Sequence, residues 1–179
     1  MIVLALDTET SGLLESRLMK ADRQPHVLQF CGILTDIDTG EVQDEFTTFV
    51  RPPRKELLSD KISKITGITW KDLEQAPEFK DVATRIFNMI AAAPIVVAHN
   101  LSFDQEVLDT EAKRLGTVIM WPKVCCSTEA TVHLKGYRLT LSELHEYLTG
   151  TEFEKAHSAD ADVKALVRCL IEMRKKDFI

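Results

Sequence analysis

Short apolar runs of strand length recur through the first hundred residues of the chain. The turn signal Asp38-Thr39-Gly40 separates two of these runs, and this arrangement predicts a β-hairpin. Apolar or alternating runs predict strands at Ile2–Leu6, Val27–Asp36, Glu41–Val50 and Ile95–Ala98.

Helical spacing of apolar residues dominates the second half of the chain. The predicted helices are the segment FKDVATRIFNMIAAA (79–93), Ser102–Leu115, Thr140–Leu148 and Ser158–Lys176. Gly116 and Gly150 follow two of them as expected C-caps, and Ser158 is the expected N-cap of the last. Strands followed by alternating helices predict an α/β fold with a mixed sheet flanked by helices.

Length and composition narrow the class of protein. With 179 residues, 45% of them hydrophobic, the chain is expected to form a single domain over residues 1–179 with a sizeable core. No apolar run approaches the roughly 20 residues of a membrane span, so no membrane partner is expected. The start, MIVLALDTET, enters directly into a strand pattern and does not resemble a secretion signal.

The four cysteines give no sign of a zinc site. They lie at positions 31, 125, 126 and 169, and the adjacent pair Cys125–Cys126 cannot easily share one metal. Reduced thiols and a cytoplasmic location are therefore the expectation.

Charge restricts the partners. A net charge of −6 argues against broad coating of nucleic acid, although it leaves room for an enzyme that grips a short strand. Basic residues nevertheless gather in one stretch, at Arg51, Arg54, Lys55, Lys61, Lys64 and Lys71. A solvated, mixed surface is the alternative interpretation of that stretch.

Two carboxylates come directly after the first apolar run. Asp7 and Glu9 are two residues apart, so on a strand both side chains point to the same face. Ligand sites in open α/β sheets favour the carboxyl edge where these acids lie. Acids in turns after strands are also common, so the pair alone is weak support for a metal site.

Asp104 and Asp162 each share a helical stripe with apolar residues. Asp104 aligns with Val107 and Leu108, and Asp162 aligns with Ala165 and Leu166. A purely electrostatic role in the first turn of each helix is the alternative. Acids that face a core usually hold a positive charge, and a hydrated divalent cation is the natural candidate.

His157 lies just before the last predicted helix, five residues ahead of Asp162. A histidine in that position is often only a surface residue. It is also well placed to act as a mobile proton acceptor.

Together these residues resemble the DEDDh branch of the DnaQ-like 3′→5′ exonucleases, which includes the proofreading epsilon subunit of bacterial DNA polymerase III. The segments IVLALDTETSGL, APIVVAHNLSFDQEVL and KAHSADADVKAL are similar to the family's three motifs, and the resemblance spans nearly the whole chain. It implies an RNase H-like fold with a central mixed five-stranded sheet flanked by helices.

The resemblance also implies a mechanism. Asp7, Glu9, Asp104 and Asp162 would hold two Mg²⁺ or Mn²⁺ ions, and His157 would be the general base. Such an enzyme hydrolyses single-stranded DNA or frayed 3′ ends to nucleoside 5′-monophosphates. Hard oxygen ligands suit these metals.

The substrate-binding positions implied by the resemblance are Thr10, Leu13, Ile65 and Phe103. Ile65 and Phe103 could equally be core residues. Thr66 stands in the segment KITGIT where family members often have histidine, and this difference is expected to weaken or alter contacts to the terminal phosphate. The stretch Leu13–His26 has no assigned role, and a mobile rim over the active site is one interpretation.

Three alternatives stay open. An RNase T-like exoribonuclease would use the same chemistry on RNA, and the sequence has no feature that decides between the two sugars. A non-catalytic nucleic-acid-binding module is disfavoured because all four acids and His157 are present. A polymerase accessory module is the third alternative; a freestanding enzyme is favoured over it because the sequence does not indicate a polymerase partner. Neither the pathway nor the oligomeric state is determined.

Overall fold

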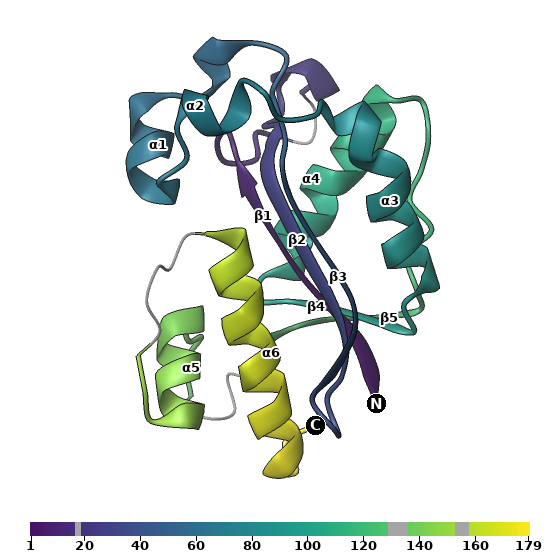
Figure 1. The fold of residues 1–179 in the computed structure, drawn as a ribbon, viewed down its shortest axis with the longest axis vertical. Coiled ribbons are helices and arrows are strands. Elements are labelled where there is room, and N and C mark those ends of the chain that lie inside the picture. Colours follow the sequence, from purple (N-terminus) through teal and green to yellow (C-terminus); the bar gives the residue numbers. More distant parts are fainter. Residues whose placement is uncertain (17–18, 129–135, 153–157) are drawn as a thin grey trace.

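A computed structural model describes residues 1–16, 19–128, 136–152 and 158–179 of the chain. A five-stranded mixed sheet forms its centre, in the order β3-β2-β1-β4-β5 (Figure 1). The strands are β1 Ile2–Thr10, β2 Val27–Asp36, β3 Glu41–Phe49, β4 Ile95–Ala98 and β5 Val124–Ser127. The pairs β1–β2 and β2–β3 are antiparallel, whereas β1–β4 and β4–β5 are parallel. The predicted mixed five-stranded sheet is thereby confirmed.

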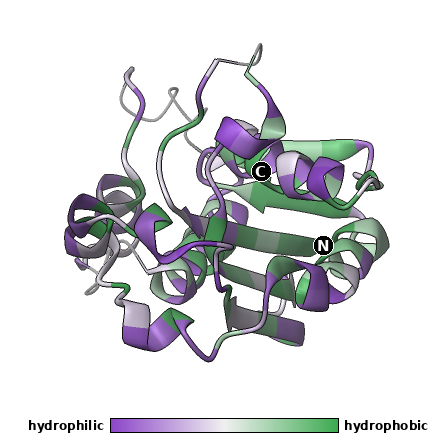
Figure 2. Cartoon of the chain, turned by 90° about the horizontal axis from the view of Figure 1, so that it is seen from above, coloured by the Kyte–Doolittle hydropathy of each residue, from purple (hydrophilic) through white to green (hydrophobic). Residues whose placement is uncertain are grey.

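Helices cover both faces of the sheet. The α-helices are α1 Asp60–Thr66, α2 Trp70–Leu73, α3 Phe79–Ala92, α4 Leu101–Arg114, α5 Leu141–Thr149 and α6 Ala159–Lys175; two short 3₁₀ helices are η1 Ala21–Arg23 and η2 Lys55–Leu57. Helices α3 and α4 pack on one face, α6 packs on the other, and α5 packs against α6. The strands at the centre of the sheet are among the most apolar parts of the fold (Figure 2). Among the described residues, no helix combines the length and apolar character needed to cross a bilayer.

The alternation of side chains along β1 sets up both sides of the site. Leu4 and Leu6 point into the core under α3 and α4, whereas Val3 and Ala5 point into the core under α6. Because successive side chains of a strand alternate, the acids that follow continue the row of Val3 and Ala5 toward α6. The threonines between them continue the other row, toward α4.

Strand β1 is longer than the apolar pattern predicts. Its predicted end at Leu6 is wrong, because antiparallel pairing with β2 continues to the pair Thr10↔Val27 after a register shift at Glu9. Backbone hydrogen bonds hold this polar end of the strand, so hydrophobicity alone could not reveal it. The acids Asp7 and Glu9 therefore lie within the strand rather than beyond it.

The connection between β3 and α3 forms an arm at the end of the sheet where β1 finishes (Figure 1). It comprises η2, α1 and α2, none of which the apolar periodicity predicted. The residues that anchor it are Leu58, Ile62, Ile68, Trp70 and Leu73, which pack together on Leu28 of β2. Ser59 caps α1 by accepting a hydrogen bond from the backbone N of Ile62, and Gly67 ends that helix in the left-handed conformation.

Candidate active site

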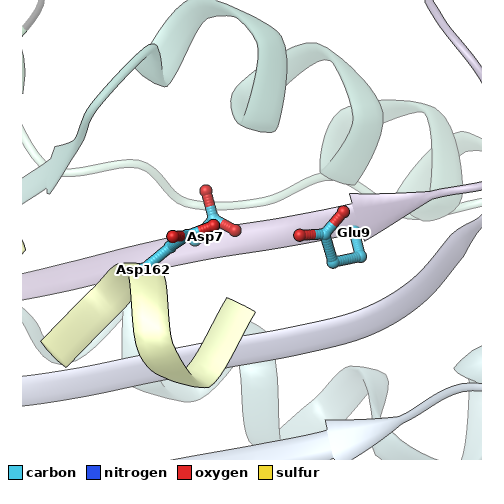
Figure 3. A group of neighbouring side chains, drawn as sticks. All are labelled: Asp7, Glu9 and Asp162. Atoms are coloured by element: carbon cyan, nitrogen blue, oxygen red, sulfur yellow. The ribbon is translucent and has the colours of Figure 1, made fainter. Parts of the chain in front are cut away.

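Three acids from two distant parts of the chain meet at the end of the sheet. Asp7 and Glu9 project from β1 and Asp162 projects from the first turn of α6 (Figure 3). One carboxylate oxygen from each lies within 4.8 Å of the others. The predicted convergence of these three side chains is therefore present in the structure.

The fourth acid, Asp104, approaches from the opposite face of the sheet. It lies in the first turn of α4 and is 3% exposed. Its Oδ1 accepts hydrogen bonds from the backbone N of Thr8 (3.0 Å) and from the Thr8 hydroxyl (2.8 Å). Paired residues of β1 and β4 reach only Ala5↔Val97, so Asp104 takes the place of a strand partner beside Thr8.

Thr8 is a positioning residue that the sequence motifs did not single out. It stands between the two acids of β1, and its side chain points to the α4 face. Asp7 and Glu9 thus face α6, while Thr8 binds the carboxylate on α4. The three consecutive residues Asp7, Thr8 and Glu9 thus supply two of the acids and contact the other two, Asp104 through Thr8 and Asp162 through the facing carboxylates.

Burial and mutual repulsion disfavour the ionised forms of Asp7, Glu9 and Asp104 in the absence of a cation. Burial raises the pKa of Asp7 well above its ordinary value, and repulsion from Asp104, Asp162 and Glu9 raises it further. Burial and then repulsion from Asp162 and Asp104 raise the pKa of Glu9 to about 7. Burial raises the pKa of Asp104 to about 7, although the hydrogen bonds from Thr8 oppose this shift.

This donor set fits a divalent metal. Within the described part of the chain, neither Asp7 nor Glu9 forms an ion pair with a lysine, arginine or histidine. Buried carboxylates that repel one another need a compensating positive charge. Hard oxygen donors at this spacing suit Mg²⁺ or Mn²⁺, and binding would favour the ionised form of each acid.

Gln29 of β2 is a second residue that the sequence motifs did not single out. Its Oε1 accepts a hydrogen bond from the backbone N of Ala159 (3.1 Å), the first residue of α6. In the sheet, Gln29 is paired with Glu9. A polar glutamine within a mostly apolar strand is the sequence signal that could have identified this residue. Its hydrogen bond fixes the start of α6, three residues before Asp162.

The end of α6 that faces the site differs slightly from its prediction. Ser158 is the N-cap residue as expected, but its side chain makes no capping hydrogen bond. Asp160 points elsewhere, as expected from its place on the helix, and forms an ion pair with Lys164 at 2.7 Å. His157 falls outside the described residues, so its predicted role as general base stays a prediction.

The predicted substrate-binding positions differ in exposure. Leu13 is 83% exposed and Ile65 is 47% exposed, so the alternative of a core role for Ile65 is wrong. Phe103 is partly buried and packs against the core under α4. Thr10 is buried, and its hydroxyl donates to the Gly12 carbonyl at 2.7 Å. Of these four positions, Leu13 and Ile65 are thus the two that expose an apolar side chain at the surface.

Polar contacts fasten the segment between β1 and β2 to α4. Arg114 donates to the carbonyl oxygens of Ala21, Gln24 and Pro25 at 2.6–3.2 Å. Glu111, also on α4, pairs with Arg114 at 2.8 Å and with His26 at 3.2 Å. Burial opposes ionisation of Glu111, but the hydrogen bond from His26 and the charge of Arg114 lower its pKa overall.

Gln24 braces the same segment from within. Its side-chain amide accepts from the backbone N of Glu15 and donates to the carbonyls of Glu15 and Ser16, at 2.9–3.3 Å. Ser11 adds a backbone and a hydroxyl contact to His26, each 2.9 Å long. The described parts of Leu13–His26 are therefore bonded to the domain, and the interpretation of this stretch as a mobile rim gains no support.

The exonuclease family RNase_T matches residues 4–170. This chain belongs to that family. The predicted membership in the DnaQ-like exonucleases of the RNase H-like superfamily is thereby confirmed, and with it the expected enzyme class.

The sequence is similar to parts of much longer polymerases. A PolC-type DNA polymerase III from Caldanaerobacter subterraneus subsp. tengcongensis is 32% identical over 178 residues, which cover 97% of this chain and 12% of the polymerase. The PolC-type polymerase of Staphylococcus haemolyticus is 34% identical over 113 residues, covering 63% of this chain and 7% of the polymerase. This chain therefore matches only a small fraction of either relative.

Two solved structures of low sequence identity show the same fold. The nuclease domain of 3′hExo, described as a DEDDh family member bound to rAMP, superposes with a TM-score of 0.76 at 17% identity and covers 98% of this chain and 92% of that one. E. coli Exonuclease I in complex with a dT13 oligonucleotide has a TM-score of 0.75 at 21% identity, covering 99% of this chain and 43% of that one. These likenesses confirm the predicted RNase H-like fold.

Proposed function

We propose that this exonuclease is metal-dependent and hydrolyses single-stranded DNA or frayed 3′ ends in the 3′→5′ direction, releasing nucleoside 5′-monophosphates. The observation that carries the proposal is the convergence of Asp7, Glu9 and Asp162 within 4.8 Å, with Asp104 held beside them by Thr8. The low-identity structural neighbours, one bound to rAMP and one to a dT13 oligonucleotide, are consistent with a single-stranded substrate.

The acids would hold two Mg²⁺ or Mn²⁺ ions. When bound, these ions supply positive charge that acidifies an attacking water and stabilises the leaving 3′-oxygen of a phosphodiester. Asp7, which is repelled by both Asp162 on α6 and Asp104 on α4, would be one of the ligands. Thr8 keeps Asp104 oriented, and Gln29 fixes the start of the helix that carries Asp162.

His157 would accept the proton of the attacking water. In the sequence it lies one residue before Ser158, the N-cap of α6, and five residues before Asp162. An imidazole titrates near neutral pH, which suits proton transfer under working conditions. Leu13 and Ile65, whose apolar side chains are exposed, would contact the terminal nucleoside. Apolar contact and stacking tolerate any base, so this contact would not select a sequence.

Single strands labelled at either end test the proposal. With Mg²⁺, a 3′-labelled strand should release labelled mononucleotide from the start, whereas a 5′-labelled strand should shorten through a descending ladder. EDTA should abolish both. Early release of label from the 5′ end, or undiminished hydrolysis in EDTA, would overturn the proposal.

RNA is the second candidate substrate, because 3′hExo is bound to rAMP in its crystal structure. Matched DNA and RNA strands of one sequence, assayed side by side, decide between them. A higher kcat/KM on DNA supports the leading proposal. A higher value on RNA assigns the enzyme to the trimming of RNA 3′ ends.

The similarity to PolC-type polymerases favours a replication context over RNA turnover. A proofreading enzyme must act on a primer end that has frayed from its template. A primer with a mismatched 3′ terminus should therefore be shortened faster than a fully paired one. Equal rates on the two primers would argue against this role.

A further inference from the structure

The arm between β3 and α3 carries a charge opposite to that of the rest of the chain. Residues 51–71 contain six lysine or arginine residues against two acids, and the whole connection 50–78 contains six against five, in a chain whose net charge is −6. Such local excess of one sign is an electrostatic footprint for a partner of the opposite sign. On a mixed, solvated surface these cations would instead be interspersed with acids.

The structure does not neutralise them. Five of the six are exposed, and within the described part of the chain none of the five forms an ion pair: Arg54, Lys55, Lys61, Lys64 and Lys71. The sixth, Arg51, is different because it pairs with Glu78 at 3.1 Å. Arg54, Lys55, Lys61 and Lys64 therefore present positive charge to solvent without a paired carboxylate among the described residues. Lys71 is also exposed, but its charge lowers the pKa of the neighbouring Asp72.

The cations lie close together because η2, α1 and α2 pack against one another. Lys61 and Lys64 are three residues apart on α1 and so neighbour each other on its surface. The ammonium of Lys55 lies 5.7 Å from the ring centroid of Trp70, which places it against α2, the helix that also carries Lys71. The apolar side of both helices is buried on Leu28, leaving the charged side outward.

The arm also lies at the end of the sheet where the acids of the site meet. Leu28, on which it packs, immediately precedes Gln29, and Gln29 is paired with Glu9. Figure 1 shows α1 and α2 beyond the end of β1, at the same end of the sheet where α6 begins. The exposed Ile65 also belongs to α1, so one helix carries both the proposed nucleoside contact and two of the cations.

We propose that this basic arm, residues 54–71, binds the sugar-phosphate backbone of the substrate strand a few nucleotides upstream of its 3′ end. The inference rests on the proposed exonuclease function and adds a binding surface outside the four acids. The arm supplies charge without a base-reading pocket, so its grip is independent of sequence. It also accounts for how an acidic protein retains a polyanion beside a cluster of carboxylates.

Matched triple variants test the arm. The test variant is Lys61→Gln, Lys64→Gln and Lys71→Gln; the control is Lys123→Gln, Lys175→Gln and Lys176→Gln. The control removes the same charge near the start of β5 and the end of α6, at the opposite end of the sheet. Affinity for a labelled 15-nucleotide single strand is measured across a KCl series with Asp7→Asn added to prevent hydrolysis.

Each phosphate contact on a single strand contributes about 0.7 to the slope of log affinity against log salt. The test variant should therefore lower the slope by about 2 and weaken binding at low salt at least roughly tenfold. The control should change neither quantity by more than roughly twofold, since its charges face no substrate. An unchanged slope in the test variant would overturn the proposal and favour a merely solvated surface.

A short substrate separates failure of the arm from failure of the proposed function. The two triple variants, with Asp7 intact, are assayed on a nitrophenyl ester of thymidine 5′-phosphate, which is too short to reach the arm. A raised KM on the strand with no loss on the ester supports the arm, and equal losses on both overturn it. If the wild-type protein hydrolyses neither substrate, the exonuclease proposal itself fails.

Discussion

Asp104 on α4 accepts two hydrogen bonds from Thr8 on β1, although 96 residues separate them in the sequence. The contact fixes the fourth acid relative to Asp7 and Glu9, which flank Thr8 on the same strand. It also lowers the pKa of Asp104 against the effect of burial. Thr8 therefore keeps this carboxylate both oriented and easier to ionise.

Replacement of Thr8 tests this positioning role. Thr8→Val removes the hydroxyl but keeps the shape and the backbone N–H, so we expect about 1 kcal/mol lower stability and about tenfold weaker metal affinity. Thr8→Ser restores a hydroxyl and should recover most of the metal affinity. Metal affinity is measured by Mn²⁺ titration. A valine variant that binds Mn²⁺ as tightly as the wild type would contradict the role.

Asp7→Asn should have opposite effects on activity and on metal-free stability. Hydrolysis should fall more than about 100-fold, since loss of a metal ligand should exceed the 10–100-fold typical of its supporting contacts. In EDTA at pH 8 the variant should gain about 1 kcal/mol or more, roughly 2–4 °C in Tm, because a buried, repelled charge is removed. Asp160→Asn, whose carboxylate pairs with Lys164, is the charge-matched control and should change activity little. Destabilisation by Asp7→Asn in EDTA would show that this carboxylate has a structural partner instead.

The same repulsion makes the metal-free protein pH-dependent. Glu9 and Asp104 have ordinary pKa values of 4.5 and 3.8, and burial raises both to about 7. Between those limits the folded chain binds more protons than the unfolded chain, so the free energy of unfolding falls as pH rises from about 4 to about 7. Above that window these groups cause no further loss.

Urea unfolding in EDTA at several pH values measures this dependence. Glu9→Gln should reduce the slope of stability against pH, and Mg²⁺ at pH 8 should recover much of the lost stability by binding the ionised carboxylates. The electrostatic description of the site would be contradicted if the free energy of unfolding in EDTA increased from pH 5 to pH 7 and if this increase were larger in the wild type than in Glu9→Gln.

Replacement of the mostly buried Arg114 should lower the free energy of unfolding markedly. Arg114→Ala leaves three carbonyl oxygens and the buried carboxylate of Glu111 without their guanidinium partner, so we expect a loss of about 2–4 kcal/mol. Arg114→Lys should recover only part of this, because one ammonium cannot reproduce the planar fork of donors. Urea unfolding measures the loss, with the exposed Arg168→Ala as control. Equal stabilities of Arg114→Ala and Arg168→Ala would show that the contacts of Arg114 with the segment between β1 and β2 do not stabilise the fold.

The sequence predicts the elements whose hydrophobic pattern is strong. Strands β2 and β4 have the predicted bounds, and α3 and α4 lie within a residue of theirs, because each has a continuous apolar face. The convergence of Asp7, Glu9 and Asp162 was predicted from spacing and from resemblance, and the geometry agrees.

The elements that were missed depend on contacts rather than on pattern. Strand β5 has only four residues, Val124–Ser127, with no buried side chain, and its pairing with β4 defines it. Helices α1 and α2 are seven and four residues long, so local periodicity is too short to detect them. Thr8 and Gln29 were missed because a single polar residue in a strand does not reveal its partner on another element.

A Mn²⁺ titration of the wild-type protein and of Asp7→Asn, monitored by electron paramagnetic resonance, tests the metal site most directly. The acid cluster predicts two bound ions per chain in the wild type and a marked loss of affinity in the variant, while Asp160→Asn binds as the wild type does. Identical binding curves for the wild type and Asp7→Asn would show that the ions, if bound at all, are held elsewhere.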